Sequence, residues 1–438
     1  MQIVIPLLQT DIVKILLQKE EIMEKTLRFD SLLVHGGLEA GPAGATAVPV
    51  VQSSSFAYRR AEDLEDVFRG RAVGSVYTRI GNPTTDALER RLALLEGGGA
   101  AIATASGMAA ITTAVLTILR SGDEILSSSS LFGGTFSLFR DTLSNYGITV
   151  TFVDPLDQDG FRNAINERTR LLFVETIGNP KLDVPDVPAL ARIAHEAGLP
   201  IMVDSTVTTP YLATGAELEA DILAYSTSKY INGTGTTIGG VIVDRGVFDW
   251  NSPKFPHFEQ FYKKYRAFAF TARARKLVHK DVGACPAPFN SFLLTEGVQT
   301  LALRMDRHCS NALALARFLK GHSKVAWVKY PGLEDSPQHE VAKRLYGGRY
   351  GGLLAFGTGD KASAFKVINS LKLAKNLANI GDAKTLVIHP ASTICADYNA
   401  EEKSLMGVTE DLIRVSVGIE NVLDIIDDFK QALEGAVK

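Results

Sequence analysis

The stretch DILAYSTSKYINGTGTTIGGVIVD, residues 221–244, sets two short apolar runs on either side of a loop of glycines and hydroxyl residues. The runs have the length and composition of buried strands. Between them stands one basic side chain, Lys229, although lysine is strongly hydrated and is usually kept at the surface. Because GGVIVD follows the loop so closely, we expect it to return beside the first strand and to make the sheet a mixed one.

Strand–helix alternation surrounds this stretch. It predicts an α/β fold with a mainly parallel sheet covered by helices, followed by a smaller C-terminal α+β domain. Apolar runs predict strands at residues 100–107, 148–155, 170–176, 199–206, 221–226, 239–244, 326–332, 351–359 and 413–420. Amphipathic patterns predict helices at residues 84–98, 108–119, 187–198, 295–322, 361–379 and 421–436.

Composition changes along the chain predict three parts. Residues 1–84 form an N-terminal leader and arm, 85–288 an α/β domain, and 289–438 the α+β domain. Within the second part, residues 250–285 contain many aromatic and basic side chains, with prolines near both ends, and we predict an insertion there. The leader is apolar but interrupted, so it is too short for a membrane span; it predicts a short amphipathic helix or an over-long start, with Met23 as the initiator.

The bulk composition excludes several classes of protein. Of 438 residues, 46% are hydrophobic and 22% charged, which excludes wholesale disorder. A formal net charge of −3 gives no basic field for nucleic acid or an anionic membrane. The three cysteines, Cys285, Cys309 and Cys395, are too widely separated for a metal site or a disulfide framework, which suits a reducing cytoplasm.

Three groups of residues fall where predicted strands end, the edge at which ligands bind to parallel sheets. Gly107 and Met108 open a helix whose free N–H groups favour a phosphate. Asp204 follows a run of apolar residues, and Lys229 follows another. Each has an ordinary alternative: a close-packed turn, a helix cap and a solvated loop lysine, respectively. Together, however, they meet the needs of pyridoxal phosphate, which requires an anion site, an acid for its ring nitrogen and a lysine for covalent attachment.

The sequence also resembles the Cys/Met-metabolism group of fold-type I pyridoxal-phosphate enzymes, over residues 28–435. The motifs that carry the resemblance are YTRIGNPT (77–84), ASGMAAI (105–111), LFGGT (131–135), ETIGNP (175–180), VDST (203–206), YSTSKY (225–230), GDAKTLVIHPAS (381–392) and IRVSVGIE (413–420). Their number and order leave chance very unlikely. The resemblance implies the fold of the pyridoxal-phosphate transferases and a homo-oligomer built from dimers, with a tetramer as the expected size.

The resemblance also implies roles for individual residues. Lys229 would hold the cofactor covalently and carry protons to and from the substrate. Asp204, with Thr206 beside it, would pair with the ring nitrogen, and Phe132 would stack on the ring. The phosphate would be held by Gly107, Met108, Ser226 and Ser228.

Residues from a second subunit complete the implied site. Tyr77 and Arg79 would reach the phosphate of the neighbouring subunit, and Tyr77 would also take part in catalysis. Arg414 would bind the substrate α-carboxylate through a bidentate pair, which suits a guanidinium group. Asn179 and Thr385 would lie close to the substrate or to the cofactor 3′-oxygen.

The choice of reaction rests on smaller features. The segment SPKFPHFEQFY (252–262) is similar to an extra segment of O-acetylhomoserine sulfhydrylases, and Gly134 stands where methionine γ-lyases usually carry a cysteine. Phe132 stands where most relatives have tyrosine, and Thr234 where a histidine is common. ASTICA (391–396) replaces the threonine–histidine ending that is usual near residue 394. We therefore expect sulfhydrylation of an O-acylhomoserine, most readily O-acetylhomoserine, to homocysteine.

Other readings stay open at this point. The rival activities are those of a methionine γ-lyase, a cystathionine γ-synthase or a cystathionine γ-lyase, and the rival without chemistry is a catalytically silent relative that binds the cofactor. A nicotinamide-binding protein is weaker, since no G-x-G-x-x-G follows the first strand. The sulfur donor is sulfide, a thiol, or a thiocarboxylated carrier protein that docks on the basic insertion.

Overall fold

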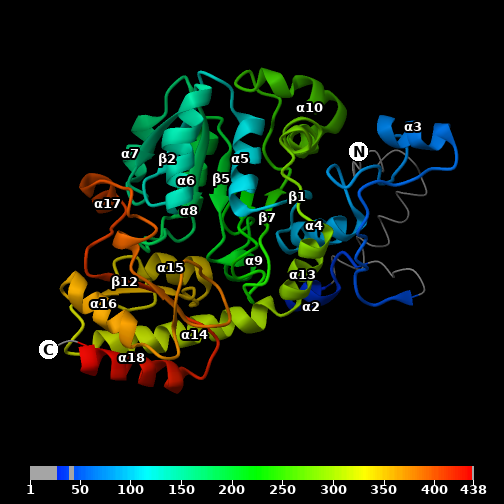
Figure 1. Cartoon of the computed structure of the whole chain (residues 1–438). Helices are drawn as coiled ribbons and strands as arrows, with labels where there is room; N and C mark the ends of the chain where they lie inside the picture. The colour runs from blue at the N-terminus through cyan, green and yellow to red at the C-terminus, as the bar shows by residue number, and fades with distance from the viewer. Residues whose placement is uncertain (1–26, 39–43, 437–438) are drawn as a thin grey trace. The chain divides into compact units, whose positions relative to one another are not determined.

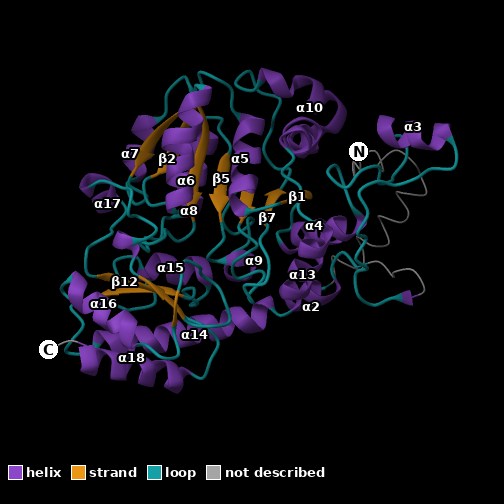
Figure 2. Cartoon of the chain, in the orientation of Figure 1, coloured by secondary structure: helices purple, strands orange, loops and turns teal. Residues whose placement is uncertain are grey.

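The computed structural model describes residues 27–38 and 44–436, so the predicted N-terminal helix of the leader lies outside the described residues. Two compact units divide the chain, and neither is a continuous stretch of sequence. Unit 1 consists of residues up to 120, of 221–228 and of 236–300, and unit 2 of residues 121–220, 229–235 and those from 301 onward. Figure 1 labels the elements along the chain, and Figure 2 separates helices from strands.

Unit 1 holds an antiparallel group of three strands with helices around it. Its main elements are α2 (Phe29–His35), α3 (Ala61–Arg69), α4 (Pro83–Leu95), β1 (Ala100–Thr104), α5 (Gly107–Ile118), β6 (Ile222–Tyr225), β7 (Gly240–Asp244), α10 (Glu259–Tyr265), α11 (Ala269–Arg273), α12 (Lys280–Val282) and α13 (Pro288–Gln299). β7 pairs antiparallel with β6 on one side and with β1 on the other. The predicted return of the second apolar run beside the first is thus confirmed.

Unit 2 holds the parallel strands and a second sheet. Its main elements are β2 (Glu124–Ser128), α6 (Gly133–Ser137), β3 (Thr149–Val153), α7 (Gln158–Ala164), β4 (Thr169–Glu175), α8 (Val187–Glu196), β5 (Ile201–Asp204), α9 (Thr209–Leu212), α14 (Leu301–Lys320), β8 (Trp327–Lys329), α15 (His339–Tyr346), β9 (Leu353–Gly357), α16 (Lys361–Ser370), β10 (Lys375–Asn376), β11 (Leu386–Ile388), α17 (Ala400–Leu405), β12 (Leu412–Ser416) and α18 (Val422–Ala436). Pairing is parallel between β2 and β3, β2 and β4, and β4 and β5.

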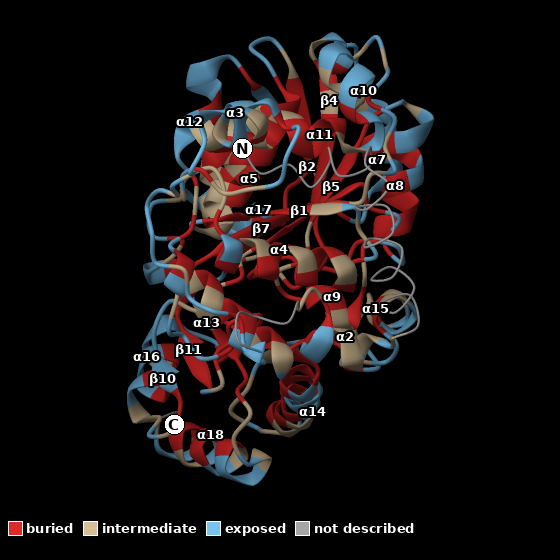
Figure 3. Cartoon of the chain, turned by 90° about the vertical axis from the view of Figure 1, so that its right-hand side faces the viewer, coloured by how far each residue is buried: buried red, intermediate tan, exposed pale blue. Residues whose placement is uncertain are grey.

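Within the larger sheet, the strand order is β1-β7-β6 in unit 1 and β5-β4-β2-β3 in unit 2. The sheet is therefore mixed, as the sequence predicts. In unit 2, β2 and nearly all of β4 and β5 are buried (Figure 3), as expected of strands that are covered on both faces. Since these three strands are parallel, the residues that follow them lie at one edge, which is where ligands bind to such sheets.

The smaller sheet belongs to the C-terminal part of unit 2 and has the order β10-β11-β12-β9-β8. β12 lies at its centre and pairs antiparallel with both β11 and β9. Helices α16 and α18 pack against each other, and α18 also contacts α14. A central strand position is the most constrained one in a sheet, so the side chains of β12 are held firmly in place.

Three differences between the predicted elements and the structure concern β2, the helix predicted at 295–322 and the end of α16. β2 was missed, because its sequence EILSS begins with a charge; Glu124 is nevertheless buried, where its carboxylate accepts hydrogen bonds from Thr151, Asn166 and Thr169. The long predicted helix 295–322 is broken between α13 and α14, at residue Thr300. α16 ends at Ser370 rather than near residue 379.

The early end of α16 has a physical cause in Asp428 of α18. Its carboxylate accepts hydrogen bonds from the backbone N–H groups of Lys372, Leu373 and Ala374 at 2.8, 2.9 and 3.0 Å. These three amides are bound to a side chain instead of to helical carbonyl groups. The chain therefore turns at this point and continues into β10.

Some types of site do not occur in the part of the chain that the structure describes. Within it, no helix has both the length and the apolar character needed to cross a membrane. The same residues contain no cluster of His, Cys, Asp and Glu that could hold a metal ion. Cys309 and Cys395 are buried, and burial raises the pKa of both thiols to about 11.

We expect Asp428→Ala to lower the free energy of unfolding by about 2–3 kcal/mol, because three backbone donors lose a charged acceptor. Guanidinium unfolding followed by far-UV circular dichroism measures the change. Asp427→Ala is the matched control, since Asp427 is the preceding residue of α18 and is exposed. Equal effects of the two substitutions would contradict this account of the turn.

Candidate active site

The amine of Lys229 is half-buried beside a neutral group. Its Nζ donates a hydrogen bond to Oδ1 of Asn379 at 2.6 Å. Burial, and then the positive charge of Arg414, lower the pKa of Lys229 to about 8. About half of the amine is therefore unprotonated at pH 8, whereas an ordinary lysine keeps nearly all of its charge there. A neutral lysine amine is a nucleophile and a base.

Arg414 lies on the central strand β12 and is buried. Its Nη1 donates to Oδ1 of Asn179 and its Nη2 to the carbonyl group of Asn379, each at 3.1 Å. Its Nε is also buried, and among the described residues it has no hydrogen-bond partner. Although burial lowers the pKa of Arg414 to about 10, the group stays charged at neutral pH. A buried cation with an unsatisfied N–H group is suited to bind a carboxylate.

Two carboxyl groups end neighbouring parallel strands. Glu175 is the last residue of β4, Asp204 is the last of β5, and the two are partners in the register of the strands. Oδ1 of Asp204 accepts a hydrogen bond from the backbone N–H of Thr206 at 2.9 Å. Burial raises the pKa of Asp204, and burial together with the charge of Asp204 raises the pKa of Glu175 further.

Glu175 also joins two loops that the sequence singled out. Its Oε1 accepts a hydrogen bond from the backbone N–H of Phe132 at 2.6 Å. Its carboxylate accepts a second one from the backbone N–H of Asn179. The turn that carries Phe132 and the loop that carries Asn179 are thus bound to one side chain.

The predicted phosphate-binding residues belong to unit 1. Ser106 caps α5 by accepting from the N–H of Ala109 at 3.1 Å. A Cβ atom on Gly107 would lie 2.6 Å from Cβ of Ser226, so only glycine lets the helix start this close to the strand end. The hydroxyl of Ser228 donates to the carbonyl group of Gly239 and accepts from its N–H. Helix α5 thus presents its N-terminus beside Ser226 of the lysine motif.

Tyr77 and Arg79 lie at the surface of unit 1. Tyr77 is 44% exposed, and the guanidinium group of Arg79 stands over its ring, 5.4 Å from the ring centroid. Arg79 also donates to the carbonyl group of Lys280 at 2.6 Å. An exposed aromatic ring with a basic group above it is available to another molecule, but its role in a neighbouring subunit stays a prediction.

The hydroxyl and the backbone N–H of Thr385 are both hydrogen-bonded within the protein. Its hydroxyl donates to Glu420 at 2.8 Å and accepts from the N–H of Gly418 at 2.9 Å. Its own N–H donates to Glu420 at 2.6 Å. The structure therefore gives Thr385 a role in the turn before β11, and its predicted place beside the substrate stays a prediction.

Within unit 2, the structure joins five predicted or newly found residues into one chain of contacts. Lys229 binds Asn379, which binds Arg414; Arg414 binds Asn179, whose N–H is bound by Glu175. Phe132 is attached to the same glutamate, and Asp204 is its strand partner. The roles of all these residues toward a cofactor or a substrate stay predictions.

Sequence reasoning missed Asn379 and Glu175. Both lie next to or within motifs that it used: Asn379 is two residues before GDAKTLVIHPAS, and Glu175 opens ETIGNP. A carboxamide and a buried acid beside such motifs are weak signals on their own. Only the fold shows that Asn379 lies beside a lysine 150 positions away.

Comparison with known proteins identifies the family. The sequence profile described as "Cys/Met metabolism PLP-dependent enzyme" matches residues 30–434. The chain belongs to this family of pyridoxal-phosphate enzymes. The predicted cofactor, pyridoxal phosphate, is thereby confirmed.

Individual relatives in the Cys/Met family match along nearly their whole length. A homocysteine synthase of Schizosaccharomyces pombe is 46% identical over 93% of this chain and 98% of its own. An O-acetyl-L-homoserine sulfhydrylase of Leptospira meyeri is 41% identical over 94% and 98%. A crystal structure of a putative O-acetylhomoserine (thiol)-lyase of Campylobacter jejuni, with a pyridoxyl-lysine phosphate, has a TM-score of 0.90 at 33% identity and covers 93% and 100%. The predicted fold is confirmed by this likeness.

The residues present fit pyridoxal phosphate. About half of the Lys229 amine is neutral at pH 8, and Asp204 is a partly buried acid at the end of a parallel strand. Gly107 leaves no room for a side chain beside Ser226, so the start of α5 can approach an anion with its backbone. Each chemical requirement of the cofactor is therefore met by a residue of this chain.

We expect Asn379→Asp to raise the pKa of Lys229 by about 1–3 units, because a carboxylate would replace the neutral amide beside the amine. In the cofactor-free protein, the rate at which an amine-directed reagent labels Lys229 would then rise only at higher pH. Peptide mapping by mass spectrometry over a pH series measures the midpoint.

Asn376→Asp is the control, because Asn376 is an exposed carboxamide in the nearby strand β10. A midpoint that moves equally in both variants, or in neither, would show that Asn379 does not set the charge state of Lys229.

Proposed function

We propose that this protein is an O-acetylhomoserine sulfhydrylase, which joins O-acetylhomoserine and sulfide to give homocysteine and acetate. The observation that carries the proposal is the contact chain from Lys229 through Asn379 to the buried Arg414, with one N–H of Arg414 left without a partner among the described residues. A base and a carboxylate-binding group that share one neighbouring residue meet the needs of an α-amino-acid substrate, which supports the proposal. Relatives named for this reaction are 39–46% identical over most of the chain.

The residues of the chain divide the work as follows. Arg414 binds the substrate α-carboxylate through the N–H group that is otherwise unsatisfied. Lys229, neutral in about half of the molecules at pH 8, takes the proton from the substrate α-carbon. Pyridoxal phosphate supplies the electron-withdrawing ring that makes this proton acidic. In the net reaction the bond from Cγ to the acetate oxygen breaks, a Cγ–S bond forms, and acetate leaves with the electron pair.

The turn at LFGGT supports an ester substrate. Phe132 has no hydroxyl group, so it cannot donate a proton to a leaving group. Acetate is a stable anion and needs less help from an acid than a thiolate or an amine. Gly134, where methionine γ-lyases usually have a cysteine, supports the same choice.

The setting of the reaction forms part of the proposal. We expect a dimer-based homotetramer in which Tyr77 and Arg79 serve the neighbouring subunit, since both are exposed side by side on unit 1. The absence of disulfide-forming spacing among the cysteines supports the cytoplasm, within sulfur-amino-acid biosynthesis. Sulfide is the proposed donor, and a thiocarboxylated carrier protein is the alternative donor.

Product analysis tests the reaction. The cofactor-loaded protein is incubated with O-acetylhomoserine and sulfide, with the ester and cysteine, with the ester alone, and with methionine alone. We expect homocysteine in the first tube only. Cystathionine from the second would indicate a γ-synthase, methanethiol from the fourth would indicate a methionine γ-lyase, and either as the main product would overturn the proposal.

Arg414→Lys should raise the KM for O-acetylhomoserine about 10- to 100-fold and leave the KM for sulfide nearly unchanged. A lysine keeps the charge but loses the paired N–H geometry, which is worth roughly 1.5–3 kcal/mol at a charged group. Steady-state kinetics with each substrate varied in turn measures the split. Arg344→Lys, at an exposed arginine paired with Asp186, is the control. A rise in the KM for sulfide of the same size would contradict the assignment.

A further inference from the structure

The turn between β2 and α6 carries one exposed ring on an almost bare backbone. Phe132 is 39% exposed, and it is followed by Gly133 and Gly134. The buried side chain of Leu131 anchors the turn before the ring, and those of Thr135 and Phe136 anchor α6 after it. Between the ring and Thr135, two residues without side chains offer little packing of their own. The position of the Phe132 ring therefore depends on the hydrogen bonds made by its backbone.

Glu175 holds the first side of this turn. It accepts the N–H of Phe132 at 2.6 Å, a distance typical of a strong bond to a charged or buried acceptor. The carboxyl group is itself fixed at the end of β4, beside Asp204 of β5. The turn is thus tied to the strand end that carries the predicted partner of the cofactor ring nitrogen.

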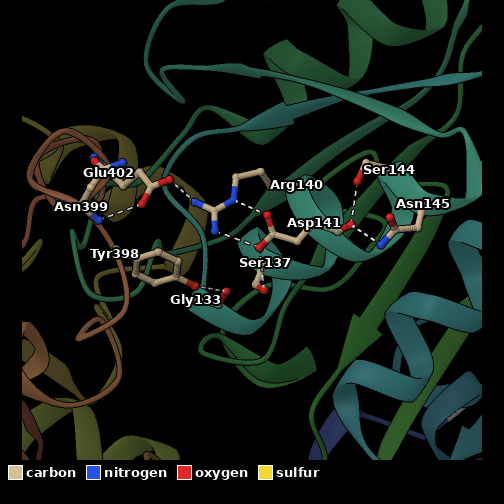
Figure 4. A network of polar contacts seen from close by, with 9 residues as sticks. All are labelled: Gly133, Ser137, Arg140, Asp141, Ser144, Asn145, Tyr398, Asn399 and Glu402. Atoms are coloured by element: carbon tan, nitrogen blue, oxygen red, sulfur yellow. Dashed lines mark hydrogen bonds and ion pairs between the residues drawn. The ribbon is translucent and has the colours of Figure 1, made fainter.

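Tyr398 holds the other side. Its hydroxyl donates to the carbonyl group of Gly133 at 2.7 Å, as Figure 4 shows. A Cβ on Gly133 would lie 3.1 Å from that hydroxyl oxygen, closer than side chains usually approach. Glycine at 133 therefore leaves the room that the tyrosine needs to reach the backbone. The N–H of Phe132 and the carbonyl group of the next residue are each fixed by a different side chain.

The ring of Tyr398 is held in turn by the helical segment that follows the turn. The rings of Phe136 and Tyr398 lie nearly perpendicular, with their centroids 5.7 Å apart. The guanidinium group of Arg140 stands over the Tyr398 ring, 5.6 Å from its centroid. Arg140 also pairs with Asp141 and with Glu402, so one cation joins this segment to α17 (Figure 4). The chain around residues 398–402 is thereby tied to the turn it contacts.

The start of helix α17, which contacts Arg140, is fixed by a capping box. Asn399 and Glu402 form a reciprocal capping box, in which each side chain accepts the backbone N–H of the other residue. Glu402 uses its remaining oxygen for Arg140. The network therefore ends in a fixed helix start rather than in a loose loop.

We propose that Glu175 and Tyr398 are positioning residues that hold the Phe132 turn from two sides and so set the place of its ring against the bound cofactor. The inference rests on the proposed function, since it takes Phe132 to stack on that cofactor. It gives a role to Glu175 and Tyr398, neither of which was a predicted site residue. Because the side chain of Phe132 has no hydroxyl group, it cannot be held by a hydrogen bond of its own. Its position therefore depends on the residues that bind the backbone of the turn.

A double-mutant cycle tests the inference through cofactor binding. Pyridoxal phosphate is titrated into the cofactor-free wild type, Tyr398→Phe, Phe132→Leu and the double variant, and both the Kd and the circular dichroism of the bound cofactor are measured. We expect Tyr398→Phe to raise the Kd about five- to tenfold and to reduce the dichroic band. In the Phe132→Leu background the same change should alter the Kd less than about twofold, because it acts through the ring that is already missing.

Matched variants separate positioning from stability. Tyr330→Phe removes a buried hydroxyl that likewise donates to a glycine carbonyl, that of Gly351 at 2.9 Å, and should lower the melting temperature without changing the Kd. Glu175→Gln keeps an acceptor oxygen for the N–H of Phe132 and should bind the cofactor better than Glu175→Ala.

Two results would overturn the inference: an unchanged Kd in Tyr398→Phe, or equal effects of that substitution with and without Phe132. Either of these in a protein that makes homocysteine contradicts the inference alone. A wild type that binds pyridoxal phosphate but makes no homocysteine contradicts the proposed function alone.

Discussion

Withdrawing a lysine amine from water is costly unless the amine meets an anion or gives up its proton. In the described part of this chain, the amine of Lys229 donates to a neutral carboxamide, and the positive charge of Arg414 acts on it. Both factors favour the unprotonated form. The fold keeps this arrangement because β12, which carries Arg414, is the central strand of its sheet. Chemistry at the amine depends on that rigidity.

The larger features of the fold were predictable because their signals are local. Alternating strands and helices, a glycine at the start of α5 and a polar residue at each strand end can all be seen within windows of a few residues. Lys229, Asp204 and Gly107 were found in this way, since each lies at the end of a strand or a few residues after it. The antiparallel return of β7 was predictable for the same reason, because the loop before it is short.

The features that were missed depend on partners far away in the sequence. Glu124 looks like a surface residue until Thr151, Asn166 and Thr169 satisfy it inside the sheet. The amides after α16 leave the helical pattern because of Asp428, more than 50 positions later. Asn379 likewise becomes part of the site only through its distant contacts. No window of sequence contains both members of such pairs, so patterns alone cannot show them.

The buried thiols have a consequence for a protein that handles reduced sulfur. With pKa values near 11, Cys309 and Cys395 are thiolates in roughly one molecule in ten thousand at pH 7, against a few per cent for an ordinary cysteine. Exchange with disulfides and persulfides needs the thiolate and access to it. The thiols of Cys309 and Cys395 are thus protected from the exchange reactions that sulfide itself can undergo.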